Sequence, residues 1–168
     1  DYFLLNGEKA FISGAEESDI YIVMAKTGEK EISCFVVDKE LEGVKFGKME
    51  DKMGWNVQPT KAVIFEDVKV PKENLLGERG QGFKIAMSGL DGGRVNIASC
   101  SLGGAAYCLE TATQYLKTRK QFNQPLSNFQ YLQFKLAQMA TDLEASRLMV
   151  RNAARMIDEQ NKDKTMYC

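Results

Sequence analysis

Histidine is absent from this sequence of 168 residues. Without imidazole, the chain cannot build a Ser-His-Asp or Cys-His catalytic centre, nor a zinc site that needs histidine. Any general base that it carries must therefore be a carboxylate, a lysine or a tyrosine. We expect no metal site.

Excess charge and long apolar runs are also missing. The 22 Lys and Arg residues nearly balance the 23 Asp and Glu residues, which leaves a formal net charge of −1. So weak a field gives no reason to expect a nucleic acid or an anionic membrane as partner. No apolar run approaches the roughly 20 residues that cross a bilayer, so we expect no membrane insertion.

Cysteine is sparse and unclustered. The four cysteines show neither C-x-x-C spacing nor the framework of a small disulfide-rich domain, so we expect free thiols in a reducing compartment. The chain begins at Asp1 inside an apparent strand, with no initiator methionine and no signal peptide. We therefore expect it to be a piece of a longer protein.

The first part of the chain has the pattern of β-strands. Asn6-Gly7 is a strong tight-turn signal, which predicts that a strand over residues 2–5 ends there and that another begins at Lys9. Further β-rich runs occupy residues 20–25, 32–37, 44–46 and 62–68. Because no amphipathic helix separates them, we expect an antiparallel sheet or a small barrel over residues 1–72.

After Pro71 the pattern becomes helical, which makes the predicted class α+β. One helix is expected from Phe83 to about Arg119, interrupted at 91–94 because two adjacent glycines cost about 2 kcal/mol relative to alanines. Residues 127–130 have capping-box spacing and should begin a second, antiparallel helix. The expected apolar faces comprise Ile85, Leu90, Ile97, Leu102, Leu109 and Leu116 in the first helix, and Leu132, Leu136, Met139, Leu143, Val150 and Ile157 in the second. Such long apolar stripes with few partners indicate missing neighbours.

Three local clusters could carry chemistry, and each has an ordinary structural alternative. The glycine run at 77–83 lacks GxGxxG order, so a turn before a helix is favoured over a phosphate loop. The cations Lys117, Arg119 and Lys120 suit either the negative end of a helix or an anion site. Phe11 and Ser13 could stack on and hydrogen-bond to a planar cofactor, although a core-facing Phe beside a turn Ser is favoured locally.

The order and spacing of several segments resemble the acyl-CoA dehydrogenase family of flavoproteins over nearly the whole chain. These segments are YFLLNGEKAFIS (2–13), VIFEDVKVPKENLL (63–76), GQGF (80–83), GGR (92–94), RKQF (119–122), QYLQFKLAQMA (130–140) and ASRLMVRNA (145–153). Residues 12–21, 54–56 and 96–105 are most similar to the members that act on short branched-chain substrates such as isobutyryl-CoA, in mitochondrial valine breakdown.

The resemblance implies a larger fold of three parts. This chain would hold most of the middle β domain, residues 1–72, and the first part of a C-terminal four-helix bundle, residues 73–168. The resemblance also implies FAD bound between the subunits of a homotetramer arranged as a dimer of dimers. The implied substrate is an acyl-CoA, the implied electron acceptor is electron-transfer flavoprotein, and the implied location is the mitochondrial matrix.

The same resemblance assigns residues to the cofactor and to the substrate. Phe11 would lie beside the flavin ring, Ser13 near its reactive nitrogen and carbonyl, and Ile12 would contribute backbone. Arg119 would reach the FAD phosphates of a neighbouring subunit. The remaining implied contacts are Gln121, Phe122, Phe129 and Gln130 for the dinucleotide, and Asp91, Gly92, Gly93 and Arg94 for the acyl-CoA channel.

The resemblance implies a reaction in which a glutamate removes an α-proton while a hydride leaves the β-carbon for flavin. In most members this glutamate lies farther along the chain than Cys168. A minority carry it just before the channel arginine, where this sequence has Gly93. We therefore expect no catalytic residue in the chain and no activity from it alone. The alternatives are a short straight-chain acyl-CoA dehydrogenase, or a non-enzymatic, truncated oligomerisation or interaction module.

Overall fold

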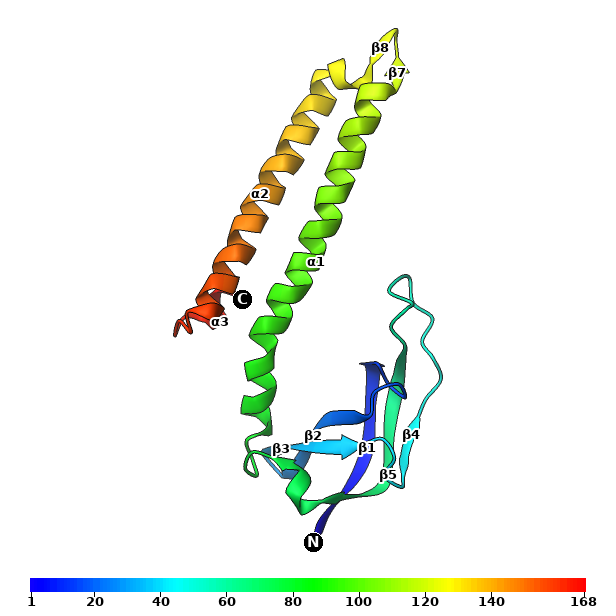
Figure 1. The fold of residues 1–168 in the computed structure, drawn as a ribbon, viewed down its shortest axis with the longest axis vertical. Coiled ribbons are helices and arrows are strands. Elements are labelled where there is room, and N and C mark those ends of the chain that lie inside the picture. Colours follow the sequence, from blue (N-terminus) through cyan, green and yellow to red (C-terminus); the bar gives the residue numbers. More distant parts are fainter. The chain divides into compact units, whose positions relative to one another are not determined.

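The computed structural model describes residues 1–168 and has the predicted α+β composition (Figure 1). The chain divides into two compact units, Asp1–Met87 and Ser88–Cys168. The first unit contains the sheets, and the second contains most of the helical residues.

Two open antiparallel sheets, each of three strands, form the first unit. In one sheet, β5 (Thr60–Pro71) lies between β1 (Tyr2–Ser13) and β4 (Val44–Phe46). In the other, β3 (Glu31–Asp38) lies between β2 (Ile20–Gly28) and the short β6 (Leu75–Leu76), which follows the 3-10 turn η1 (Lys72–Asn74). The antiparallel prediction is confirmed, and the sheets do not close into a barrel.

The tight turn predicted at Asn6-Gly7 is wrong. Strand β1 continues through both residues, and its register against β5 shifts between Leu5 and Gly7. The Asn6 side chain donates to Asp67 Oδ1 at 3.0 Å and accepts from the Asp67 backbone N–H at 2.8 Å. Because both halves of β1 pair with the same long partner, the local turn signal produces a bulge instead of a hairpin.

Alternating apolar side chains from both sheets form the core of the first unit, as the period of two in a strand requires. Phe3 packs edge-to-face on Phe35 with ring centroids 5.0 Å apart. The buried core consists of Leu5, Ala15, Tyr21, Val23, Phe35, Val37, Val63, Phe65, Val68 and Val70. Each large apolar side chain buried in this way contributes about 1.5–3 kcal/mol.

The long helix α1 (Gly82–Thr118) runs without interruption for 37 residues, so the predicted break at 91–94 is wrong. Gly92 and Gly93 keep the helical path despite their poor propensity. Asp91 Oδ1 lies 3.5 Å from Arg94 one turn on, and Asp91 Oδ2 accepts from Thr165 at 2.8 Å, which supports the helix here. Tertiary contacts thus override propensity.

A hairpin of β7 (Lys120–Gln121) and β8 (Gln124–Pro125) leads through the 3-10 turn η2 (Leu126–Asn128) into α2 (Gln130–Asp158). The predicted capping box is wrong, because the N-cap is Phe129 and no side chain caps it. Gln133 Nε2 instead donates to the Ser127 carbonyl at 2.8 Å. A one-turn helix, α3 (Lys164–Tyr167), follows α2.

The second unit buries few side chains. Its only buried apolar residues are Ala153 and Met156. Of the residues predicted to line the helix faces, Leu90, Ile97 and Met139 are exposed, and the others are half-buried. Residues from α1 and α2, among them Leu102, Leu109, Met139 and Leu143, line an open groove of about 640 Å³. No helix of this protein combines the length and apolarity needed to cross a membrane.

Candidate functional site

The end of β1 presents an aromatic ring and a hydroxyl to solvent. Between Lys9 and Ile12 the register against β5 shifts, so that two residues of β1 oppose one residue of β5. At this bulge Phe11 has a φ of 56°, a left-handed conformation that costs a bulky residue about 1–3 kcal/mol. Phe11 is 73% exposed, so the core-facing interpretation is wrong.

The residues beside Phe11 divide between core and solvent. Ile12 packs partly against the core, whereas Ser13 is exposed and its hydroxyl makes no hydrogen bond within the chain. Ile12 and Ser13 line a shallow pocket of about 230 Å³ together with Tyr21 and Val63. The arrangement offers an aromatic surface and an uncommitted hydroxyl, as a planar heteroaromatic ligand with a polar edge requires.

The second cluster lies where α1 ends. Lys117 occupies the last turn of α1, so the helix-terminus interpretation suits it. Arg119 and Lys120 lie beyond the helix end, and neither they nor Lys117 form an ion pair. The Arg119 carbonyl accepts from the Leu126 N–H at 2.8 Å, which fixes its backbone while its side chain stays exposed. Three uncompensated cations gathered here suit an anionic ligand.

Two aromatic residues and two amides follow Arg119 in the hairpin and at the start of α2. Phe122 is 86% exposed at the tip of the β7–β8 hairpin, and its ring meets Phe129 edge-to-face at 6.1 Å. Gln121 Nε2 donates to the Lys120 carbonyl at 2.9 Å, and Gln130 is exposed at the first position of α2. The hairpin therefore brings the predicted cofactor residues 119–130 into one neighbourhood.

The third cluster lies near the start of the second unit. Asp91 is only 7% exposed, and its carboxylate contacts Arg94 and Thr165. Gly92 and Gly93 are exposed, and a Cβ added to either would contact nothing within 4 Å. The helix thus presents bare backbone beside a fixed carboxylate and a guanidinium. Sequence reasoning missed Thr165, which lies 74 positions from Asp91 and carries no local signal.

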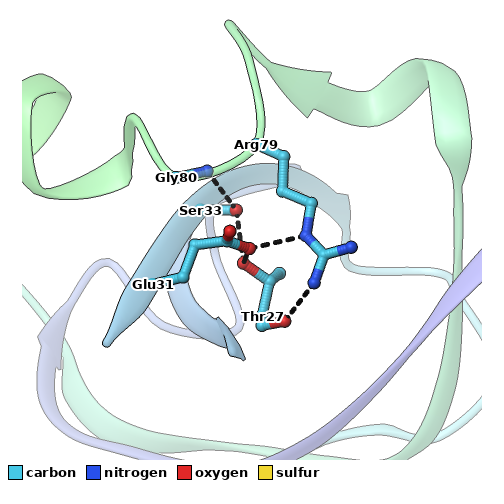
Figure 2. A network of polar contacts seen from close by, with 5 residues as sticks. All are labelled: Thr27, Glu31, Ser33, Arg79 and Gly80. Carbon is cyan, nitrogen blue, oxygen red and sulfur yellow. Dashed lines mark hydrogen bonds and ion pairs between the residues drawn. The ribbon is translucent and has the colours of Figure 1, made fainter. Parts of the chain in front are cut away.

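A polar network joins the β2–β3 hairpin to the glycine run before α1 (Figure 2). Glu31 Oε1 accepts from the Thr27 hydroxyl at 2.6 Å and from Arg79 Nε at 2.5 Å. Arg79 Nη2 also donates to the Thr27 carbonyl, and the Gly80 N–H donates to Ser33 Oγ at 2.9 Å. Because Ser33 engages this amide, the run acts as a turn that feeds α1, as the favoured interpretation predicted.

The network predicts a pH dependence of stability. The hydrogen bond from the Thr27 hydroxyl, followed by that from Arg79, lowers the pKa of Glu31 below its ordinary value. The ionised Glu31 carboxylate therefore contributes fully to stability at pH values above its pKa in the unfolded chain. This contribution is lost as the pH falls through the lower pKa that Glu31 has in the folded chain. Thermal melts from about pH 6 to about pH 3 should show a difference between wild type and Glu31→Gln that shrinks with acidity.

The neighbouring Glu29→Gln is the matched control, because Glu29 is exposed and has no hydrogen-bond partner in the chain. Its melting temperature should follow that of wild type across the range. A Glu31→Gln difference that stayed constant with pH would contradict the role of the ionised carboxylate.

Two family models match the chain. The acyl-CoA dehydrogenase middle domain matches residues 1–68, and the acyl-CoA dehydrogenase C-terminal domain matches residues 80–167. The mitochondrial isobutyryl-CoA dehydrogenase of Dictyostelium discoideum is 56% identical over 99% of this chain, and that of Bos taurus is 57% identical over 100%. The chain covers 41% of each relative, so it spans about two fifths of their length.

Solved structures agree with these matches. Butyryl-CoA dehydrogenase from Megasphaera elsdenii has a TM-score of 0.93 at 44% identity, covering 99% of this chain and 44% of that one. An acyl-CoA dehydrogenase from Bacillus anthracis, solved in complex with FAD, has a TM-score of 0.86 at 39% identity, covering 94% of this chain and 27% of that one. The chain belongs to the acyl-CoA dehydrogenase family, whose members are FAD-dependent oxidoreductases.

Proposed function

We propose that this chain is a segment of an FAD-dependent dehydrogenase that introduces an α,β double bond into isobutyryl-CoA, a short branched-chain acyl-CoA. The observation that carries the proposal is the bulge at Phe11, which holds a bulky residue in a strained conformation and exposes it to solvent two positions before the exposed Ser13. Strain of this kind persists where function requires it. The branched-chain substrate is supported by the two isobutyryl-CoA dehydrogenases at 56% and 57% identity.

The residues at the end of β1 fit a flavin. The Phe11 ring offers an apolar face, while the Ser13 hydroxyl can donate to or accept from a polar ring edge. Ile12 holds the strand end against the core and so fixes its own peptide group beside the ring. FAD, when bound, supplies the acceptor for the hydride that leaves the β-carbon of the substrate.

The residues after α1 fit the phosphates of the dinucleotide. Arg119 provides a planar fork of donors that matches a phosphate in two places, and Lys120 adds charge. Phe122 and Phe129 supply apolar surface next to it, and Gln121 and Gln130 supply amide groups.

The spacing along α1 supports a shared site between copies. Asp91 precedes Arg119 by 28 positions, which along an α-helix corresponds to about 42 Å. This is farther than one dinucleotide extends. We therefore infer that Asp91 and Arg119 of one copy belong to two different active sites. We propose a homotetramer, a dimer of dimers, in which Arg119 binds the FAD of a neighbouring copy.

The acyl-CoA would pass Asp91 and Arg94. The bare backbone at Gly92 and Gly93 allows a chain-like ligand to approach α1 closely, and Arg94 lies next to it with a side chain 49% exposed. Asp91 is already engaged by Arg94 and Thr165, and Gly93 has no side chain. We propose that the base is a glutamate outside residues 1–168.

The proposal also covers the location of the enzyme, its electron acceptor and its domain boundary. We propose that it works in the mitochondrial matrix, as the word mitochondrial in the names of both relatives supports, and that electron-transfer flavoprotein reoxidises it. We also propose a functional boundary between the β domain, residues 1–72, and the helical domain, residues 73–168.

Substrate preference tests the proposal. In the full-length protein, kcat/KM for isobutyryl-CoA should exceed that for butyryl-CoA and isovaleryl-CoA by about 10- to 200-fold, because the placement of one methyl group in an apolar pocket is worth about 1–3 kcal/mol. Steady-state rates with an artificial electron acceptor give these ratios. Faster turnover of butyryl-CoA would assign the protein to the short straight-chain members, and no turnover of any of the three would favour an interaction module.

A further inference from the structure

The Asp91 carboxylate is the one buried acidic group of the second unit. Burying a carboxylate costs several kcal/mol unless partners compensate for the lost water. Two partners are present, one at each oxygen. Arg94 Nη1 lies 3.5 Å from Oδ1, and the Thr165 hydroxyl donates to Oδ2 at 2.8 Å.

The two partners have different geometry. Arg94 lies one helical turn from Asp91 on the same helix, and its contact at 3.5 Å is long. Thr165 lies on α3, which follows α2, and its hydrogen bond to a charged acceptor has normal length. The shorter bond therefore comes from the residue that is remote in sequence, and it fixes the carboxylate plane more firmly than Arg94 does.

We infer that Thr165 is a positioning residue for the acyl-CoA site, a role that rests on the proposed function. By holding Oδ2, the hydroxyl prevents the Asp91 carboxylate from rotating, so that Oδ1 stays beside Arg94. Arg94, whose side chain is 49% exposed, then keeps most of its N–H donors directed away from Asp91 and available to the thioester carbonyl or to the phosphate oxygens of the acyl-CoA.

The exchange Thr165→Val tests this role, because valine has nearly the shape of threonine and lacks the hydroxyl. In the full-length protein it should raise KM for isobutyryl-CoA about tenfold, the effect of losing one hydrogen bond to a charged group, with kcat changed less than about twofold. The dissociation constant of the product, methacrylyl-CoA, measured by titration calorimetry, should rise by the same factor. Thr165→Ser, which retains the hydroxyl, should restore both values.

Thr141→Val is the matched control. The Thr141 hydroxyl donates to the Ala137 carbonyl at 2.9 Å on the exposed surface of α2, so its loss should leave KM and kcat unchanged. If Thr165→Val does not fold, Thr165→Ala provides the same measurement. A variant with lower melting temperature or FAD content but unchanged KM and product affinity would show a structural role only, and would overturn the inference.

Asp91→Asn separates this inference from the proposed function. If Asp91→Asn raises KM and Thr165→Val does not, the positioning role is wrong and the substrate site stands. If Asp91→Asn leaves KM and product affinity unchanged, residues 91–94 do not form the substrate site, and both claims fail. When both exchanges are combined, the effect should be no larger than that of Asp91→Asn alone, since Thr165 acts through Asp91.

Discussion

Replacing Arg119 with alanine in the full-length protein is expected to weaken FAD binding by about 10- to 100-fold, because a bidentate contact to phosphate consists of hydrogen bonds between charged groups. Arg119 lies past the end of α1, is exposed, and has no acidic partner in the chain. Its removal therefore leaves no buried carboxylate unpaired, and the fold should persist. The flavin retained per protomer after dialysis, and the Kd from reconstitution of the apoprotein, measure the effect.

Two further variants make the Arg119 result specific. Arg119→Lys keeps the charge and loses the planar fork, so its affinity for FAD should lie between those of wild type and Arg119→Ala. Arg151→Ala is the matched control, because Arg151 is an exposed arginine of α2 without an ion pair. Unchanged FAD affinity in Arg119→Ala would show that Arg119 does not bind FAD, and that it contributes to subunit assembly at most.

Gly82→Ala is expected to destabilise the protein by about 1–3 kcal/mol or more, because the methyl group has no room. An added Cβ would lie 2.6 Å from the Ser33 carbonyl carbon, 2.7 Å from its oxygen and 2.9 Å from the Ile32 oxygen. All three atoms are backbone atoms of β3, so no side-chain rotation relieves the contact. The start of α1 would have to move away from the sheet, with loss of the bond from Gly80 to Ser33. Urea unfolding monitored by circular dichroism measures the change.

Gly89→Ala, in the same helix, has the opposite expectation. A Cβ at Gly89 meets nothing within 4 Å, so alanine should stabilise the helix by about 0.8–1 kcal/mol through its better propensity. The pair therefore separates steric fit from helix propensity. Equal unfolding free energies for Gly82→Ala and wild type would show that the sheet and the helix start are not packed as described.

The periodicity of apolar residues predicted the types of the secondary-structure elements well, whereas local turn and helix-breaking signals gave wrong predictions. Asn6-Gly7 is a turn signal and Gly92-Gly93 a helix-breaking signal, yet β1 continues through the first with a bulge and α1 continues through the second without interruption. In the first case β5 pairs along the whole of β1. In the second, Asp91 is supported by Arg94 and Thr165. Such long-range partners are invisible to a reading of neighbouring residues.

For the candidate sites too, local sequence signals identified some residues, whereas long-range structure determined where they lie. Arg119 was recognisable as part of a local run of cations, but only the end of α1 at Thr118 places it beyond the helix. Phe11 looked like a core residue because the bulge that exposes it depends on the register against β5. The Glu31–Arg79 and Asp91–Thr165 contacts join residues 48 and 74 positions apart, and no sequence motif predicts either contact.

Anaerobic mixing of the purified full-length protein with isobutyryl-CoA tests whether it is an FAD-dependent isobutyryl-CoA dehydrogenase. We expect the protein to be isolated with FAD, and isobutyryl-CoA to bleach the visible absorption of the oxidised flavin while methacrylyl-CoA forms in equal amount. A protein isolated with FAD whose spectrum is unchanged by isobutyryl-CoA, or a protein that does not bind FAD at all, would contradict it.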